Sequence, residues 1–324
     1  MKYSPISKLL IAALCSLAYV STFAATTYIV ESGAGGQYST SYAESGFAAS
    51  GTGVGLAGCT ATTSRYSGTG TYFGPSRYAQ FSYAPTTTGF YEIDLAWVST
   101  AGQIGTAVNL YTGAATGGAT DRWGNTGGPV GVITSGTMNM YYTGVGAWNQ
   151  FTTAQLTSGT TYKVGIYGGY KTPYAGCVTP AYPSANRVTA GAVRFIAATP
   201  IAAANTGPAN GATEIPLTGA GNDLSWTAGN YTSFFDVFFG TTSGSLTKVG
   251  SDLLGTTLSF DPDSLNLQEG TQYFWRVDAK NVDVTTTGTE FGFTTAAIPE
   301  PSTAVLSILG GLGLAAWISR RRTA

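Results

Sequence analysis

Hydrophobic and polar side chains alternate along several short stretches of this chain. The clearest stretch is FYEIDLAWV at residues 90–98. Its large apolar positions are Tyr91, Ile93, Leu95 and Trp97, and the positions between them are Glu92, Asp94 and Ala96. This period of two predicts a strand with one face in a core and the other in solvent. YKVGIY (162–167) and AVRFIA (192–197) repeat the alternation, and segments rich in Gly, Ser and Thr separate them. The pattern predicts an antiparallel β-sandwich.

The same alternation returns in the second half of the chain after a break in composition. Residues 200–216 read PIAAANTGPANGATEIP, and this run of proline and small residues predicts a linker and the start of a new domain. YFWRVDA (273–279) then alternates, with Tyr273, Trp275 and Val277 on one face and Arg276 and Asp278 on the other. We therefore expect two all-β sandwich domains in tandem, at residues 25–198 and 207–297, joined by a linker at 199–206.

The first 24 residues have the three-part organisation of a secretory signal peptide. Lys2 and Lys8 precede the apolar run Leu9–Val20, and small residues follow it. We expect cleavage after Ala24, with Ala25 as the second choice. The alternative, an N-terminal transmembrane helix, is disfavoured because the run is shorter than a bilayer requires. The mature chain is therefore expected outside the cytoplasm.

The last residues combine an extended segment, an apolar span and a basic end. Pro299-Glu300-Pro301 cannot sit inside a helix, so it predicts an open segment that an enzyme can grip. Ser302–Ser319 carries no charge and, at ~1.5 Å per residue, spans roughly 27 Å, slightly less than a ~30 Å hydrocarbon core. Arg320, Arg321 and Arg322 follow and favour retention of this end on the cytoplasmic side. A short span that contains glycines indicates a single transmembrane sorting helix that tethers the chain temporarily.

Together these parts resemble the PEP-CTERM sorting signal of Gram-negative bacteria. The resemblance covers residues 298–324, with PEPST, an apolar span containing Gly310, Gly311 and Gly313, and a terminal RRR. It implies that an exosortase-type membrane protease recognises the Pro-Glu-Pro region and releases or transfers the protein. The implied route is a transient inner-membrane tether, followed by the cell surface or the extracellular matrix.

The composition of the chain excludes several classes of partner, catalytic site and metal site. Charged residues make up 10% and aromatic residues 13% of the chain, with 45 glycines among 324 residues, which fits an exported all-β protein. The net charge of −1 provides no basic surface, so we expect no nucleic-acid partner. No histidine is present, which removes Ser-His-Asp and Cys-His catalysis and every histidine-containing zinc site. We expect no cofactor and no bound metal.

The cysteines predict one disulfide. Of the three, Cys15 leaves with the signal peptide, and Cys59 and Cys177 remain as an even pair in an oxidising compartment. Free buried thiols are the alternative. A nucleophilic cysteine is disfavoured because it would lack a histidine partner.

Each domain also resembles a known family. RYAQFSYAPTTTGFYEIDLAW, GVGAWNQFTTAQLTSGTTYKVGIY and VTAGAVRF are similar to motifs of the Golvesin/Xly CBD-like family, with Gly191 in place of the last motif's usual aspartate. This implies a β-sandwich accessory module of polysaccharide-acting or surface proteins. NGATEIPLTGAGNDLSW, FFDVFFGTT, LQEGTQYFWRVDAKN and GFTT resemble fibronectin type III domains of bacterial extracellular proteins, with Trp226 at the end of one strand. This implies an immunoglobulin-like sandwich of roughly seven strands that acts as a spacer.

Two pairs of acidic residues are candidates for a catalytic site or a calcium site. Glu92 and Asp94 point the same way from one strand and could approach the carboxyl spacing of a glycosidase, although an ordinary solvated strand face is the favoured interpretation. Asp261 and Asp263 in DPDSLN could begin a calcium loop, but Asn266 stands where such a loop needs glycine, and a proline turn is favoured instead. Trp123, Trp148 and exposed tyrosines are further candidates, because aromatic faces can stack on sugar rings. Sandwich cores use the same residues.

The sequence favours a non-catalytic function. We expect an exported, exosortase-processed surface or matrix protein whose first domain binds exopolysaccharide or a neighbouring matrix protein. The alternative is a polysaccharide-acting hydrolase whose carboxylates the sequence does not identify. Binding of a glycan without product release would favour the first function, and formation of reducing ends would favour the second.

Overall fold

The computed structural model describes residues 27–49, 51–67, 78–98, 106–118, 128–138, 140, 145–167 and 188–297. The expected signal-peptide cleavage sites, Cys177, Trp123 and the sorting signal at 298–324 lie outside these residues. Within the described residues, helical structure is limited to two 3₁₀ turns, η1 (Ser39–Ser41) and η2 (Asp263–Leu265). No helix in this part of the chain is long and apolar enough to cross a membrane.

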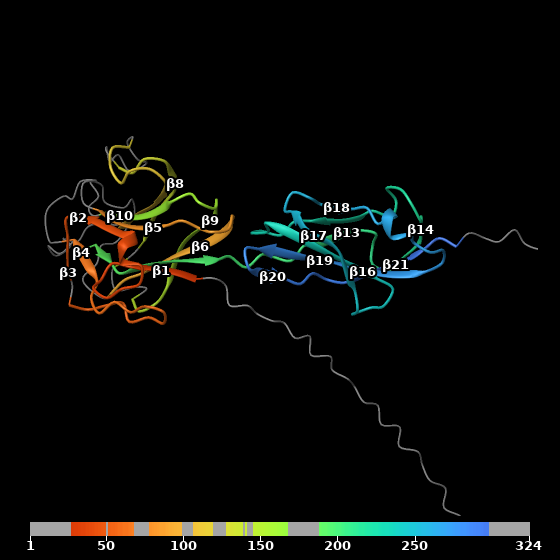
Figure 1. The fold of residues 1–324 in the computed structure, drawn as a ribbon, viewed down its shortest axis with the longest axis horizontal. Coiled ribbons are helices and arrows are strands. Elements are labelled where there is room, and N and C mark those ends of the chain that lie inside the picture. The colour runs from red at the N-terminus through yellow and green to blue at the C-terminus, as the bar shows by residue number, and fades with distance from the viewer. Residues whose placement is uncertain are drawn as a thin grey trace, which may run out of the picture.

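Two β-sandwiches lie end to end along the long axis of the molecule (Figure 1). Strands β1–β12 form the first sandwich, strands β13–β21 form the second, and no sheet contains strands of both. The all-β fold class is confirmed. Every strand pairing is antiparallel except that of β14 with β21.

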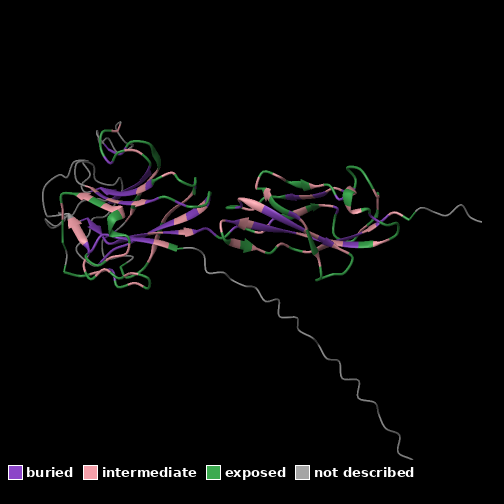
Figure 2. Cartoon of the chain, viewed as in Figure 1, coloured by how far each residue is buried: buried purple, intermediate pink, exposed green. Residues whose placement is uncertain are grey.

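The first sandwich packs a four-stranded sheet on a five-stranded sheet. The four-stranded sheet has the order β1 (Thr27–Glu31), β12 (Ala192–Ala197), β6 (Gly89–Ala96), β9 (Asn149–Leu156). The five-stranded sheet has the order β2 (Tyr42–Ser45), β5 (Tyr78–Tyr83), β10 (Tyr162–Tyr167), β7 (Thr106–Tyr111), β8 (Val132–Met138). A small third sheet contains β11 (Thr189–Ala190), β4 (Arg65–Ser67) and β3 (Phe47–Ala49). Their inward-facing side chains form one core. Figure 2 colours the buried residues of these strands purple.

Alternation correctly identified the core face of these strands. Tyr91, Ile93 and Leu95 of β6 are buried, and so are Tyr162 and Val164 of β10. Gly191 also has a structural role, because a Cβ atom there would lie 2.5 Å from the carbonyl oxygen of Ala96. Position 191 therefore accommodates only glycine.

The second sandwich has nine strands, two more than the fibronectin resemblance implies. One sheet has the order β13 (Ala204–Gly207), β15 (Leu224–Thr227), β18 (Ser259–Phe260). The other has the order β14 (Ala212–Ile215), β21 (Phe291–Thr295), β19 (Gln272–Asn281), β16 (Phe234–Gly240), β17 (Thr247–Leu254), and β20 (Val284–Thr286) pairs with β19. Trp226, Trp275 and Val277 lie in its core, as expected.

In each sandwich, the hydroxyl of one tyrosine accepts a hydrogen bond from the backbone of the preceding turn. The hydroxyl of Tyr273 at the start of β19 accepts a hydrogen bond from the Gln268 backbone at 2.8 Å. The hydroxyl of Tyr162 at the start of β10 accepts one from the Thr157 backbone at 2.9 Å. Such tyrosine corners are typical of immunoglobulin-like sandwiches.

The expected linker at 199–206 differs from the structure. Strand β13 begins at Ala204, inside this segment, and Pro200 and Ala203 are buried. The Ile201 backbone N–H donates to the carbonyl of Asn230, and the Thr286 hydroxyl donates to the carbonyl of Pro200. The segment therefore packs on the second sandwich. Its proline and small residues are therefore part of a packed segment and do not form an exposed linker.

A direct contact also joins the sandwiches. Asn281, at the end of β19, is fully buried, and its side-chain amide donates to the carbonyl oxygens of Phe90 at 2.8 Å and Ala198 at 2.7 Å. Its side-chain oxygen accepts from the Phe90 backbone N–H at 2.8 Å. The next residue, Val282, packs against the first core, and a side chain on Gly89 would collide with it. One residue of the second sandwich thus completes the backbone hydrogen bonding of the first.

Candidate functional site

The outer face of the four-stranded sheet brings together several residues that the sequence singled out. Strand register places Asp94 of β6 opposite Arg194 of β12, with Glu92 two residues away on the same face. The Arg194 Nε atom donates to Asp94 Oδ2 at 2.7 Å. The Arg194 guanidinium also lies 4.7 Å from the ring centroid of Trp148. One arginine therefore holds both the carboxylate and the indole ring.

A loop covers part of this face. Val54, Leu56 and Cys59 pack with Trp148 over apolar residues of the sheet, which are Ile29, Ala96 and Ala192. The buried carboxylate of Glu31 holds the loop in place. It accepts hydrogen bonds of 2.9 Å from the backbone N–H groups of three residues, Gln37, Thr60 and Ala61.

This covering corrects the expectation that the Glu92–Asp94–Ala96 face is open to water. Asp94 and Ala96 are each only 1% exposed. Trp148 is committed to packing and to its contact with Arg194, which favours the core interpretation of this residue. Alternation could not reveal the cover, because the loop that provides it has no strand pattern.

Burial and the neighbouring Asp94 carboxylate raise the pKa of Glu92. When protonated, the Glu92 carboxyl can share a hydrogen bond with Asp94. Asp94 Oδ1 is buried, and no hydrogen-bond donor of the described residues reaches it. A glycosidase needs two carboxyl groups that both reach the substrate. The burial and ion pair of Asp94 prevent this.

The Cys59 thiol lies at the edge of the same cluster. Burial, followed by the Glu31 carboxylate, raises the pKa of this thiol to about 11. A thiol with this pKa is protonated at neutral pH and is a poor nucleophile. Cys59 makes no disulfide within the described residues, and Cys177 lies outside them. The Cys59–Cys177 disulfide therefore stays a prediction.

A stack of four aromatic rings runs from the core of the first sandwich to its surface. The ring centroids of Phe195 and Tyr83 lie 4.7 Å apart, and those of Tyr83 and Tyr28 also lie 4.7 Å apart. The last pair, Tyr28 and Tyr38, is separated by 4.0 Å with nearly parallel rings. Phe195 is fully buried, whereas Tyr38 is 52% exposed.

The backbone of Tyr38 adds to this arrangement. Tyr38 immediately precedes η1, and its φ of 47° is in the left-handed region, which is uncommon for an aromatic residue. The stack and the backbone together hold its ring in one orientation at the surface. The sequence does not single out Tyr38 among the tyrosines, because nothing in GGQYSTSY distinguishes it from its neighbours.

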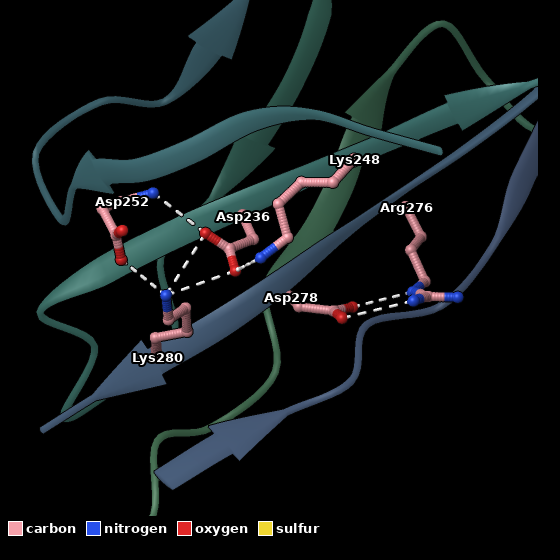
Figure 3. Close-up of polar contacts among 6 residues, drawn as sticks. All are labelled: Asp236, Lys248, Asp252, Arg276, Asp278 and Lys280. Carbon is pink, nitrogen blue, oxygen red and sulfur yellow. Dashed lines mark hydrogen bonds and ion pairs between the residues drawn. The ribbon is translucent and has the colours of Figure 1, made fainter. Parts of the chain in front are cut away.

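The second sandwich has a charged face on its larger sheet, shown in Figure 3. Asp236 of β16 accepts from Lys248 at 2.6 Å, from Lys280 at 3.4 Å and from the Asp252 backbone at 2.9 Å. Although burial raises the pKa of Asp236, these hydrogen bonds outweigh it and lower the pKa overall. Beside them, Asp278 pairs with Arg276 at 2.9 Å. These charges neutralise one another and link three strands, so the face is structural.

The acidic pair of DPDSLN forms a turn. Asp263 accepts from the Gly219 backbone at 3.0 Å and from the Asn222 side chain at 2.9 Å. Asp261 accepts from the Asp263 backbone at 2.8 Å. Asp261 therefore holds its own turn, and Asp263 ties that turn to the loop of Gly219 and Asn222. Within the described residues, no group of three or more acidic or cysteine side chains could hold a metal ion.

No protein-family model and no curated protein matches this chain. Among solved structures, a Paenibacillus xanthan lyase is similar at 16% identity and a TM-score of 0.35, over 53% of this chain and 13% of the lyase. An Fn3-like protein from Clostridium thermocellum matches at 18% identity and a TM-score of 0.24, over 32% of this chain and 100% of its own. The adhesin domain of Epf from Streptococcus pyogenes matches at 11% identity and a TM-score of 0.31, over 74% of this chain and 78% of its own.

At these identities the similarity concerns the β-sandwich fold alone. The strand order and the tyrosine corner of the second sandwich are those of a fibronectin type III-like domain.

Proposed function

We propose that this is an exported, non-catalytic surface or matrix protein whose first sandwich binds polysaccharide. The exposed Tyr38 ring at the end of the aromatic stack is the observation that carries the proposal. Sugar rings present flat apolar C–H faces, and these pack on aromatic rings. A ring already held in one orientation loses little conformational entropy when a ligand binds. The Tyr38 ring has these properties.

The hydrolase alternative is less well supported. Asp94 is buried and paired with Arg194, so the one carboxyl pair suggested by the sequence does not reach a glycosidic bond. The proposal also includes export through the signal peptide and processing by an exosortase-type protease at Pro299-Glu300-Pro301. These parts rest on the sequence, since the residues concerned lie outside those described.

Affinity electrophoresis against neutral glucans, acidic polysaccharides and the exopolysaccharide of the source bacterium tests the proposal. Tyr38→Asn removes the ring but tolerates the left-handed backbone, so the fold should be retained. Stacking contributes on the order of 1 kcal/mol, and we therefore expect about fivefold weaker binding. Tyr38→Phe keeps the ring and should bind like the unmodified chain.

Release of reducing ends is measured on the same polysaccharides. Turnover that is lost in Glu92→Gln would replace the proposed function with the hydrolase. Equal binding by Tyr38→Asn and Tyr38→Phe would show that Tyr38 does not form the site.

A further inference from the structure

Strand β8 forms one edge of the five-stranded sheet. It pairs with β7 on one side, and no strand of the described residues pairs with its other side. A register shift at Ile133 leaves Thr134–Met138 as the regular part of the strand, opposite Leu110–Thr106 of β7. An edge strand presents free backbone N–H and C=O groups that can pair with another strand.

This edge is unusually apolar for a surface strand. Val132 is 43% exposed and Ile133 is 46% exposed. Val130, just before the strand, and Val145, before β9, are exposed as well. Three of the nine large exposed hydrophobic residues of the described chain therefore lie in β8 or two residues before it.

The same side lacks the charges that usually protect an edge strand. No Asp, Glu, Lys or Arg occurs between Arg122 and Lys163, a range that includes both β8 and the neighbouring edge strand β9. Two other edge strands are protected, because β2 contains Glu44 and β17 contains Lys248 and Asp252. The contrast is within one protein, so it does not follow from low overall charge alone.

We propose that β8 pairs edge to edge with β8 of a second copy of this chain. An antiparallel pair of identical strands has twofold symmetry, and each copy contributes the same surface. A strand without charges meets its own copy without repulsion between like charges, which a charged edge could not do. Val132 and Ile133 would lose solvent contact in the pair, and the two five-stranded sheets would become one.

The middle of the regular segment also permits close approach. Gly136 lies over Phe151, and a Cβ atom there would be 2.8 Å from the Phe151 ring. Since glycine has no side chain, another backbone can approach it closely. Pairing centred on Gly136 places Thr137 of one copy opposite Ser135 of the other, on the solvent side of the joined sheet.

Sedimentation velocity of the full-length chain in mild detergent, over a range of concentrations, tests the pairing. We expect a reversible monomer–dimer equilibrium. Thr137→Lys puts a charge on the pairing edge and should weaken the dimer at least tenfold. Ala43→Lys on β2, the opposite edge of the same sheet, is the matched control and should leave the dimer unchanged. Both variants keep the C-terminal span, so association through that span would affect them equally.

Crosslinking locates the contact. With Cys15, Cys59 and Cys177 replaced by serine, Thr137→Cys should form a dimer with a short thiol-specific crosslinker, and Ala43→Cys should not. A chain that stays monomeric up to about 100 µM overturns the proposal. So does a dimer that Thr137→Lys leaves intact, or one that Ala43→Cys crosslinks as well.

Discussion

Asn281→Ala should uncouple the two sandwiches. In the structure three of the four hydrogen bonds of the Asn281 side chain cross to the first sandwich, two to Phe90 and one to Ala198. The fourth is donated by the Ser233 hydroxyl within the second sandwich. The substitution removes all four and leaves the Phe90 N–H and the Ala198 carbonyl without this partner. It changes no residue of either core.

The expected loss follows from these bonds. A buried hydrogen bond contributes about 1 kcal/mol net, and an orphaned buried group costs about 1–3 kcal/mol. Three lost crossing bonds and one orphaned N–H together reduce the coupling between the sandwiches by about 4–6 kcal/mol. The remaining contacts between the sandwiches include the packing of Val282 and the contact of the Phe90 and Tyr231 rings, whose centroids lie 5.9 Å apart. Without the Asn281 bonds we expect these contacts to be too weak to keep unfolding cooperative.

Calorimetry and tryptophan fluorescence measure this directly. The unmodified chain should unfold in one transition, and Asn281→Ala in two. Trp97 reports on the first core, and Trp226 and Trp275 report on the second. Asn222→Ala is the matched control, because Asn222 is equally buried but its side chain bonds only within the second sandwich. It should destabilise that sandwich without separating the transitions.

Limited proteolysis gives an independent result. The composition of residues 199–206 predicts early cleavage there, but the packed junction predicts resistance in the unmodified chain and cleavage in Asn281→Ala. A single unchanged transition in Asn281→Ala, with the same proteolytic pattern as before, would refute the coupling role of Asn281.

Three further predictions concern the carboxyl pair, the cysteines and the tail. The raised pKa of Glu92 means that the folded state holds a proton above pH 4.5 that the unfolded state has lost, so its contribution to stability falls as pH rises through this window. Glu92→Gln should therefore raise the free energy of unfolding at pH 7 but not at pH 4, and urea titrations that show the same difference at both would contradict this. Non-reducing peptide mapping of the exported protein should find Cys59 joined to Cys177, and two thiols that alkylate without reductant would exclude the bond. Intact-mass analysis of protein from outside the cell should show that the residues after Pro299-Glu300-Pro301 are gone, whereas retention of Arg320–Arg322 would mean that the tail is not a processed signal.

Regular strands were predictable from the sequence because the alternation of residues along each strand shows which of its faces is buried. Tyr91, Ile93 and Leu95 alternate with smaller or polar residues, and this local pattern is sufficient to assign a buried face. The same holds for Trp275 and Val277 in β19. The fold class and the core faces of these strands could therefore be inferred without coordinates.

Contacts between distant segments were not predictable in this way. Asp94 has the alternation of a solvated residue, yet a loop held by Glu31 covers it. Asn281 ends a strand and resembles a turn residue, yet it bonds to a backbone nearly two hundred positions earlier in the chain. Tyr38 gains its orientation from Tyr28, across a loop. Each of these roles depends on a partner that local periodicity does not identify.

The junction and the two proposed surfaces are mutually compatible. The β19–β20 end of the second sandwich faces the first, and β21 ends at the opposite end of the molecule (Figure 1). A chain held by its C-terminal segment would therefore carry the first sandwich at a set distance and orientation. Tyr38 immediately precedes η1 and β2, whereas β8 is the other edge of the same sheet, so pairing through β8 leaves Tyr38 free. Two rigidly held Tyr38 rings on one dimer could bind one polysaccharide chain together, which raises avidity without new contacts. The first sandwich alone sets the separation of the two rings in the dimer, since Tyr38 and β8 both belong to it.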